Sequence, residues 1–148
     1  MKQEHFRIKE VEVLKPYVLR LVFGDGEIMA VDLKGIINRI PALSPLKDPE
    51  LFAKGQIDEW GSIIEWIPGE IDMAADNLRA EAVEQQGKIS HERIWEWMYR
   101  NNLTLDAAAD ALGISRRMVA YYRSGRKPIP KHIWLACIGW ETEKSRAA

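Results

Sequence analysis

A serine that can cap a helix, Ser115, is followed by several basic residues up to Lys127. Their spacing is the clearest chemical signal in the sequence. Ser115 is a typical helix N-cap, and Gly125 is placed to end the short helix that follows. Val119 and Tyr122, four and seven residues after the cap, are expected to face inward. The residues left on the outward face are Arg116, Arg117, Ala120 and Tyr121.

An outward face of this kind suits recognition of double-stranded DNA. Arginine can donate two hydrogen bonds to guanine O6 and N7, worth about 1–3 kcal/mol of discrimination. Tyr121 could stack or touch a thymine methyl, whereas Arg123, Arg126 and Lys127 are expected to meet phosphates. The predicted DNA-binding residues are Ser115, Arg116, Arg117, Ala120, Tyr121, Arg123, Arg126 and Lys127.

The segment before this helix predicts the element that must hold it in place. Thr104 is the expected N-cap, with Asp106 in the first turn, where the helix dipole favours an anion. Gly113 can take the left-handed conformation that ends this first helix, and Ile114 then fills the corner. This order of parts predicts a helix-turn-helix; the alternative is an ordinary helical hairpin with a solvated basic face. The inward face of the first helix is expected to be Leu105, Ala108, Ala109 and Leu112.

The stretch LDAAADALGISRRMVAYYRSGRKPIP resembles the phage-repressor (Cro/C1, or XRE) class of helix-turn-helix, with a likeness from about Ile94 to Trp140. The resemblance implies a compact bundle of about five helices that often binds DNA as a dimer. One position departs from the pattern. The family often places a Gln that contacts phosphate at the start of the second helix of its bundle, which corresponds to the helix after Thr104. This chain has Leu105-Asp106 there, and an acid at that place would repel phosphate.

Charge is divided unevenly along the 148 residues. Residues 88–148 hold eleven Lys/Arg against six Asp/Glu, a net charge of +5, and residues 1–87 hold ten against sixteen, a net charge of −6. The two values sum to the overall −1. The basic half is the one with the predicted helix-turn-helix, as DNA binding requires. The acidic half is expected to contact protein, either another chain or a second copy.

The N-terminal half predicts an antiparallel sheet. Large apolar residues alternate loosely in residues 6–14 and clearly in residues 17–23, which lead into the hairpin turn Gly24-Asp25-Gly26. The predicted return strand is residues 27–33, and a second hairpin is expected from residues 55–59 and 62–67.

Short helices are predicted around these strands. Residues 34–39 are expected to form a helical turn, and Asp48 is expected to cap a helix that begins at Pro49. Residues 74–82 predict a longer helix with Asp72 as its cap.

The same half resembles a bacterial family known as domain of unknown function 2442, over about Ile8 to Leu78. The likeness rests on YVLRLVF with Asp25-Gly26, then Val31-Asp32-Leu33, Leu46 to Phe52, Ile64-Glu65-Trp66, Pro68-Gly69, Asp72 and Leu78. The resemblance implies a fold and no established activity. It also suggests an association with small regulatory or toxin–antitoxin-like modules.

Together these patterns predict an α+β protein. Residues 1–80 are expected to form a small antiparallel β-sheet domain with short helices, and residues 91–148 an all-α helix-turn-helix bundle that starts with a helix over residues 91–101 capped by Ser90. Residues 81–90 are either a mobile linker or a helical extension that ends at Gly87. Six tryptophans either fill the two cores, which is favoured, or mark an interface.

Signals for catalysis, metals and cofactors are weak. His5, His91 and His132 lie far apart, and His91-Glu92 lacks a second histidine because position 95 is Trp95. Cys137 is the single cysteine and lies in an apolar run, which predicts a buried, inert thiol and no internal disulfide. We therefore expect no enzyme activity, no catalytic or metal site and no cofactor.

No apolar run reaches the ~18 residues needed to span a membrane, and the N-terminal residues MKQEHFRIKE are polar. We expect a cytoplasmic protein without a membrane partner. Two functional hypotheses follow. In the first, the chain is a bacterial transcriptional regulator that binds a two-fold symmetric DNA site as a homodimer, with the N-terminal domain dimerising or sensing. In the second, it is an antitoxin-like or adaptor module that binds a protein through the acidic domain, and DNA binding is secondary.

Overall fold

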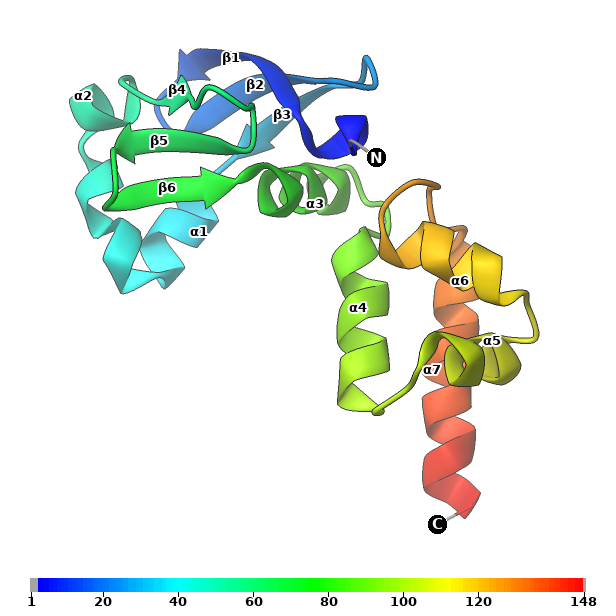
Figure 1. Ribbon diagram of the computed structural model, residues 1–148. Helices are drawn as coiled ribbons and strands as arrows, with labels where there is room; N and C mark the ends of the chain where they lie inside the picture. Colours follow the sequence, from blue (N-terminus) through cyan, green and yellow to red (C-terminus); the bar gives the residue numbers. More distant parts are fainter. Residues whose placement is uncertain (1–2, 148) are drawn as a thin grey trace. The chain divides into compact units, whose positions relative to one another are not determined.

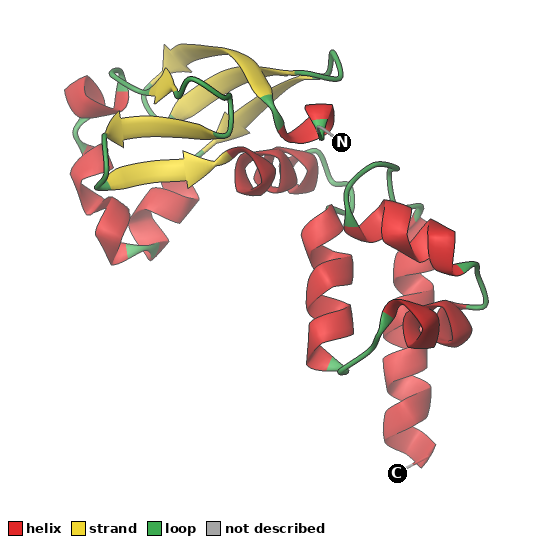
Figure 2. Cartoon of the chain, in the orientation of Figure 1, coloured by secondary structure: helices red, strands yellow, loops and turns green. Residues whose placement is uncertain are grey.

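A computed structural model describes residues 3–147 of the chain and separates it into two compact units, residues 1–85 and 86–148. Strands and short helices make up the first unit, and helices dominate the second (Figures 1 and 2). This organisation confirms the predicted α+β fold class.

The first sheet of the first unit is a three-stranded antiparallel meander. Its strands β1 (Ile8–Lys15), β2 (Val18–Phe23) and β3 (Ile28–Asp32) follow the order of the chain, with β2 in the centre. The predicted hairpin at Gly24-Asp25-Gly26 is confirmed, with Gly26 at a φ of 89°. Every second side chain of β2 is buried in the core, namely Leu19, Leu21 and Phe23.

A second antiparallel sheet follows, formed by β4 (Gln56–Ile57), β5 (Ile63–Ile67) and β6 (Ile71–Ala74). The predicted second hairpin is therefore confirmed. The prediction that Asp72 caps a helix is wrong, because Asp72 lies within β6 and pairs with Glu65 of β5. The physical reason is the alternation of Ile71 and Met73, both buried, which favours a strand before the helix can begin.

Short helices connect the two sheets. As predicted, α1 spans Lys34–Arg39, and α2 (Pro49–Phe52) begins after Asp48, whose side chain accepts a hydrogen bond of 3.0 Å from the backbone N–H of Glu50. Between them Pro41–Lys47 forms a 3-10 helix that was not predicted. In the core of the unit, the Trp66 indole donates a 2.8 Å hydrogen bond to the carbonyl of Phe52 and so links β5 to α2.

Helix α3 (Ala75–Gln85) starts directly after β6 (Figure 1) and fastens the first hairpin. Its Arg79 donates to both carboxylate oxygens of Asp25 at 3.0 and 2.8 Å and to the carbonyl of His5 at 2.8 Å. The guanidinium also lies over the Phe23 ring, 4.9 Å from its centroid. Desolvation alone would raise the pKa of Asp25, but the hydrogen bond from Arg79 and those from the backbone outweigh it and hold this pKa below its ordinary value.

The last residue of α3 covers part of a sheet edge. The Gln85 side chain accepts a hydrogen bond from the Asp32 backbone N–H at 2.9 Å and donates one to the Asp32 carbonyl at 2.7 Å. A side-chain amide here replaces the peptide group of a further strand next to β3, which satisfies an edge that could otherwise pair with another chain. After Gln85 the chain turns at Gly87, whose φ is 78°.

The second unit contains α4 (His91–Arg100), α5 (Leu105–Leu112), α6 (Arg116–Arg123) and α7 (Lys131–Ala147). Over the residues described, it thus has four helices and not the five or so that the phage-repressor likeness implies. A bridge between Ile89 and Ile129 joins the segment before α4 to the one before α7. Ser90 takes the N-cap position of α4 as predicted.

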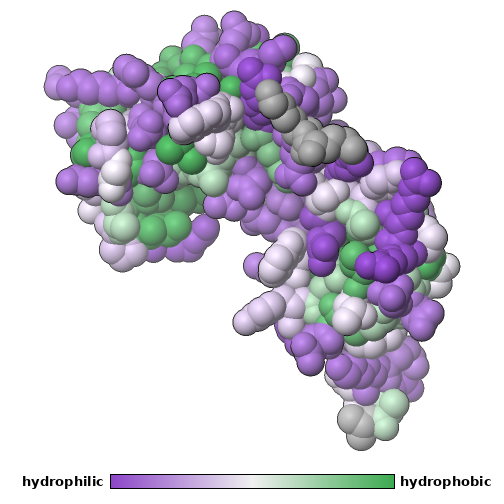
Figure 3. All heavy atoms as spheres, viewed as in Figure 1, coloured by the Kyte–Doolittle hydropathy of each residue, from purple (hydrophilic) through white to green (hydrophobic). Residues whose placement is uncertain are grey.

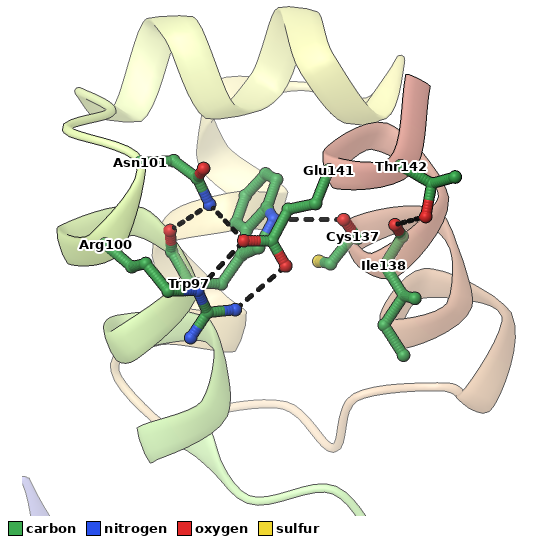
Figure 4. Close-up of polar contacts among 7 residues, drawn as sticks. All are labelled: Trp97, Arg100, Asn101, Cys137, Ile138, Glu141 and Thr142. Carbon is green, nitrogen blue, oxygen red and sulfur yellow. Dashed lines mark hydrogen bonds and ion pairs between the residues drawn. The ribbon is translucent and has the colours of Figure 1, made fainter. Parts of the chain in front are cut away.

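Helices α4 and α7 are tied together by polar contacts (Figure 4). Trp97, fully buried, donates to the Cys137 carbonyl at 3.1 Å. Arg100 donates to both carboxylate oxygens of Glu141 at 2.9 Å each, and Asn101 donates to the same carboxylate at 2.8 Å. The Arg100 hydrogen bond is the main reason that the pKa of Glu141 lies below its ordinary value.

Cys137 is buried as expected, and this burial raises the pKa of its thiol to about 12.

The tryptophans divide into buried and exposed residues. Trp66 and Trp97 lie in the two cores and Trp134 and Trp140 pack against the second core, whereas Trp60 and Trp95 are exposed. No helix among residues 3–147 is long and apolar enough to cross a lipid bilayer.

Candidate nucleic-acid interface

The turn between α5 and α6 has the two helix caps and the glycine that the sequence predicts. Thr104 Oγ1 accepts a 3.1 Å hydrogen bond from the Ala107 N–H, and Ser115 Oγ accepts one of 3.1 Å from the Met118 N–H. Gly113 lies between the helices in the left-handed region, with a φ of 71°, and its N–H donates to the Ala109 carbonyl at 2.8 Å. Both helices therefore begin at a side-chain cap, and the first ends at a glycine.

The faces of α5 and α6 are divided as the spacing predicts. Ala108 and Ala109 of α5 and Val119 and Tyr122 of α6 are buried in the core of the second unit, and small alanines let the two helices approach closely. Leu105, Leu112 and Ile114 pack around them, partly buried.

Six of the eight predicted site residues lie on the surface of α6 or at its start. Ser115, Arg116 and Arg117 are exposed, and Ala120, Tyr121 and Arg123 are partly buried. The other two, Arg126 and Lys127, are exposed in the loop after α6. Hydrophilic side chains gather over α6 in the view of Figure 3.

Tyr121 joins three of the predicted cations. The Arg117 Nε donates a 2.7 Å hydrogen bond to the Tyr121 hydroxyl, and its guanidinium carbon lies 5.4 Å from the ring centroid. From the loop, Lys127 Nζ approaches the same ring to 4.9 Å and the Arg126 guanidinium to 6.0 Å. The backbone N–H groups of Arg126 and Lys127 donate to the Tyr121 carbonyl at 3.0 and 3.4 Å. A half-buried ring thus orders a positively charged cluster, which consists of Arg117, Arg126 and Lys127.

The loop contribution to this cluster was predicted by composition only. Arg126 and Lys127 follow the end of α6, and their place around Tyr121 depends on the backbone turn at Gly125, whose φ is 77°. Hydrophobic periodicity in the sequence does not indicate which side chains a loop of this kind contacts.

Arg116 is placed next to the one acid that departs from the phage-repressor pattern. Its Nε lies 3.8 Å from a carboxylate oxygen of Asp106, in the first turn of α5, and both side chains are exposed. An exposed ion pair at this distance is weak, and the arginine can readily leave it for another partner. Asp106 therefore lowers the positive potential at Arg116 but leaves the guanidinium accessible.

Arg123 lies apart from the charged cluster. It lines a groove of about 490 Å³ with residues from α4 and from the segment between α4 and α5. Trp95 and Tyr99 form one wall and stack on each other with ring centroids 6.4 Å apart. The sequence did not predict this groove, although the four-residue spacing of Trp95 and Tyr99 places them on one face of α4. The other lining residues are Met98, Asn102, Leu103 and Thr104.

Over residues 3–147, no group of three histidine, cysteine or acidic side chains is arranged to hold a metal ion. Within the same part of the chain, every buried side-chain nitrogen and oxygen has a hydrogen-bond partner. The arrangement that stands out chemically is therefore the exposed basic surface of α6 and the loop after it.

Comparison with known proteins adds to this geometry. The family described as "Protein of unknown function (DUF2442)" matches residues 8–84, which confirms the likeness predicted for the N-terminal half. No curated protein gives a significant match. Among solved structures, the chain is similar to the crystal structure of "Putative DNA Binding Protein NE0471" from Nitrosomonas europaea ATCC 19718. The two are 50% identical with a TM-score of 0.85, over 95% of this chain and 90% of that one. This chain belongs to the DUF2442 family.

Proposed function

We propose that the chain is a sequence-specific DNA-binding protein, a bacterial transcriptional regulator whose second unit is a helix-turn-helix of the phage-repressor class. The observation on which this rests is the side-chain-capped helix α6, which packs through Val119 and Tyr122 and exposes Arg116 and Arg117. The 50% identical relative described as "Putative DNA Binding Protein NE0471" supports the proposal.

In this proposal α6 enters the major groove. Arg116 and Arg117 start the helix, and the first residues of a recognition helix are those that reach base edges. Ser115, Ala120 and Tyr121 line the same surface. Arg126 and Lys127 leave the helix in the loop, where a cation is suited to a phosphate and not to a base. Arg123 is proposed to contact the backbone from the groove beside α4.

The proposed target is a two-fold symmetric site that a homodimer binds, with half-sites about 34 Å apart. The first unit, with its acidic balance, is proposed to dimerise, sense or bind a protein partner, and not to lie on DNA. A DNA-reading protein of a bacterium acts in the cytoplasm, where the chromosome lies, and the proposal includes no catalytic step.

Selection from a random pool of double-stranded DNA, with the full-length protein at ~150 mM salt, tests the proposal. We expect enrichment of a two-fold symmetric motif. Because phosphate contacts alone bind any sequence, enrichment requires base contacts or reading of DNA shape. A folded protein that enriches no motif contradicts the proposal.

A double variant locates the contacts. Replacing Arg116 and Arg117 with alanine is expected to abolish motif preference, with a loss of about 1–3 kcal/mol for each base contact. If both affinity and preference are unchanged, α6 does not read the DNA. A protein partner that this double variant still binds with full affinity would then favour the adaptor hypothesis.

A further inference from the structure

The groove beside α4 has an aromatic wall that is open to solvent. Trp95 is 54% exposed and Tyr99 is 80% exposed, and both line the groove. Their ring planes are inclined by only 26°, so the two rings present one continuous surface along a face of α4. Large exposed aromatic side chains that are rimmed by polar groups are typical of a binding surface.

The rest of the lining is part apolar and part polar. Met98 is buried in the core of the unit, and Leu103 packs against that core. Asn102 and Thr104 add an amide and a hydroxyl, and both residues are exposed. The volume of the groove, about 490 Å³, is within the range of about 300–1,000 Å³ that is usual for small-molecule sites.

Arg123 is the single charged residue among the seven that line the groove. It lies in the last turn of α6 and is half-buried. Among residues 3–147, no carboxylate forms an ion pair with its guanidinium, whereas Arg79 and Arg100 each hold an acid. A guanidinium in this situation is suited to an anion that can accept two parallel hydrogen bonds from it.

We propose that the groove binds a small planar aromatic carboxylate. Its ring stacks on Trp95 and Tyr99, and its carboxylate accepts two hydrogen bonds from Arg123. A carboxylate matches the single positive charge of the lining, whereas a phosphate monoester carries about −1.5 to −2 at pH 7. A backbone phosphate of DNA would engage Arg123 but would leave the aromatic wall uncovered.

The ligand is also expected to weaken DNA binding, a consequence that rests on the proposed function. Arg123 is assigned there to the DNA backbone, so a carboxylate bound to its guanidinium competes with a phosphate for the same donors. The effect is reciprocal, because DNA must weaken ligand binding by the same factor.

Calorimetric titration of the full-length protein without DNA tests the site, with naphthalene-2-carboxylate as the probe. We expect one site with a dissociation constant on the order of 100 μM. Naphthalene-2-carboxamide has the same ring without the charge, and we expect it to bind at least about 10-fold more weakly. Absence of carboxylate binding at ~5 mM, or equal binding of the amide, overturns the proposal.

Variants separate the two parts of the site. Arg123→Ala and Trp95→Ala are each expected to weaken binding of the carboxylate by at least about 10-fold. Arg146→Ala is the control for the lost charge, because Arg146 is exposed in α7 and does not line the groove. Trp60→Ala is the control for the lost ring, because Trp60 is 72% exposed in the first unit. Folded groove variants that bind as tightly as the controls overturn the proposal.

The indole N–H resonances of the six tryptophans locate the bound ring in the natural chain. We expect the carboxylate to shift the Trp95 resonance, identified with Trp95→Phe, and to leave that of Trp60 in place. Equal shifts of both would show unspecific stacking on exposed tryptophans and would overturn the site.

Fluorescence anisotropy with the selected DNA site tests the competition. We expect saturating carboxylate to weaken DNA binding by about 3- to 10-fold at ~150 mM salt and to lower the slope of log affinity against log salt by about 0.9. It is expected to have no effect on Arg123→Ala. Unchanged DNA affinity of the natural chain overturns the competition.

These outcomes separate the two proposals. Protein that enriches a DNA motif but does not bind the carboxylate overturns the groove site and leaves DNA reading intact. Protein that binds the carboxylate through Arg123 but enriches no motif does the reverse.

Discussion

At the scale of single residues, the candidate interface depends on how Tyr121 orders the cations around it. Its hydroxyl accepts from Arg117, and its ring lies within 4.9–6.0 Å of the charged groups of Arg117, Arg126 and Lys127. Holding long side chains in place before binding reduces the entropy lost on contact. The tyrosine is thus a positioning residue in the proposed complex, and its role can be separated from that of the charges.

Tyr121→Phe keeps the ring and removes the hydroxyl. We expect a roughly 3- to 10-fold weaker affinity for the selected DNA site, because Arg117 is then less ordered before it binds, with an unchanged salt dependence. Lys127→Ala is expected to reduce the slope of log affinity against log salt by about 0.9, because one phosphate contact is lost. Fluorescence anisotropy over a salt series measures both. A changed slope in Tyr121→Phe would contradict the positioning role.

Asp106 acts in the opposite direction, since it places a carboxylate 3.8 Å from Arg116. Asp106→Asn is expected to tighten DNA binding by a few-fold at ~50 mM salt and by less at ~200 mM, where exposed charges are more strongly screened. Asp110→Asn, an exposed acid in the last turn of the same helix, is the matched control. Equal effects of the two variants would attribute the gain to net charge and not to the pair with Arg116.

At the scale of elements, α5 and α6 are joined by a turn in which one residue needs a left-handed backbone conformation. Gly113 has a φ of 71°, and a Cβ atom placed there meets nothing within 4 Å among the described residues. Any cost of a side chain at this position is therefore conformational and not a clash.

Gly113→Ala is expected to lower the free energy of unfolding of the second unit by about 1–2 kcal/mol. Gly139→Ala is the matched control, because Gly139 also has open space at its Cβ but lies within a helix, where alanine stabilises by up to about 1 kcal/mol. Urea denaturation at ~1 μM compares the two. A stabilising Gly113→Ala would show that the turn does not need the left-handed conformation.

At the scale of the whole molecule, each unit has its own ion pair between segments distant in sequence. Arg79 and Asp25 fasten α3 to the first hairpin, and Arg100 and Glu141 join α4 to α7. In both acids the folded-state pKa lies below the ordinary value. The stabilisation is therefore complete above the unfolded pKa and is lost as the pH falls through the folded one.

For Glu141, whose ordinary pKa is 4.5, this loss is expected below about pH 4.5. Glu141→Gln is expected to destabilise the chain at pH 7 and to have a smaller effect at pH ~3, because the stabilisation from the lowered pKa shrinks as the pH falls below the unfolded pKa. Glu143→Gln, on the exposed side of the same helix, is the control. Thermal unfolding at the two pH values measures the difference. An effect of Glu141→Gln that is equal at both pH values would contradict a contribution from the ionised pair.

The sequence by itself determined the elements whose signals are local. Caps at Thr104 and Ser115, a glycine between them and apolar spacing of three and four specify α5, α6 and their inward faces, because each signal acts within a turn or two of the chain. The Gly24-Asp25-Gly26 hairpin was predictable for the same reason. Strand β6 was missed, since two alternating residues before a helix resemble its first turn.

Only the tertiary structure decided which distant groups meet. The contact of Arg79 with Asp25, the placement of Arg126 and Lys127 around Tyr121, and the position of Arg123 in the groove beside Trp95 all depend on how elements pack. Such contacts depend on loop backbone and on interhelical geometry, and hydrophobic periodicity reports only which face of an element is buried. The basic residues were therefore predictable as a set, whereas their division into a charged cluster and a groove was not.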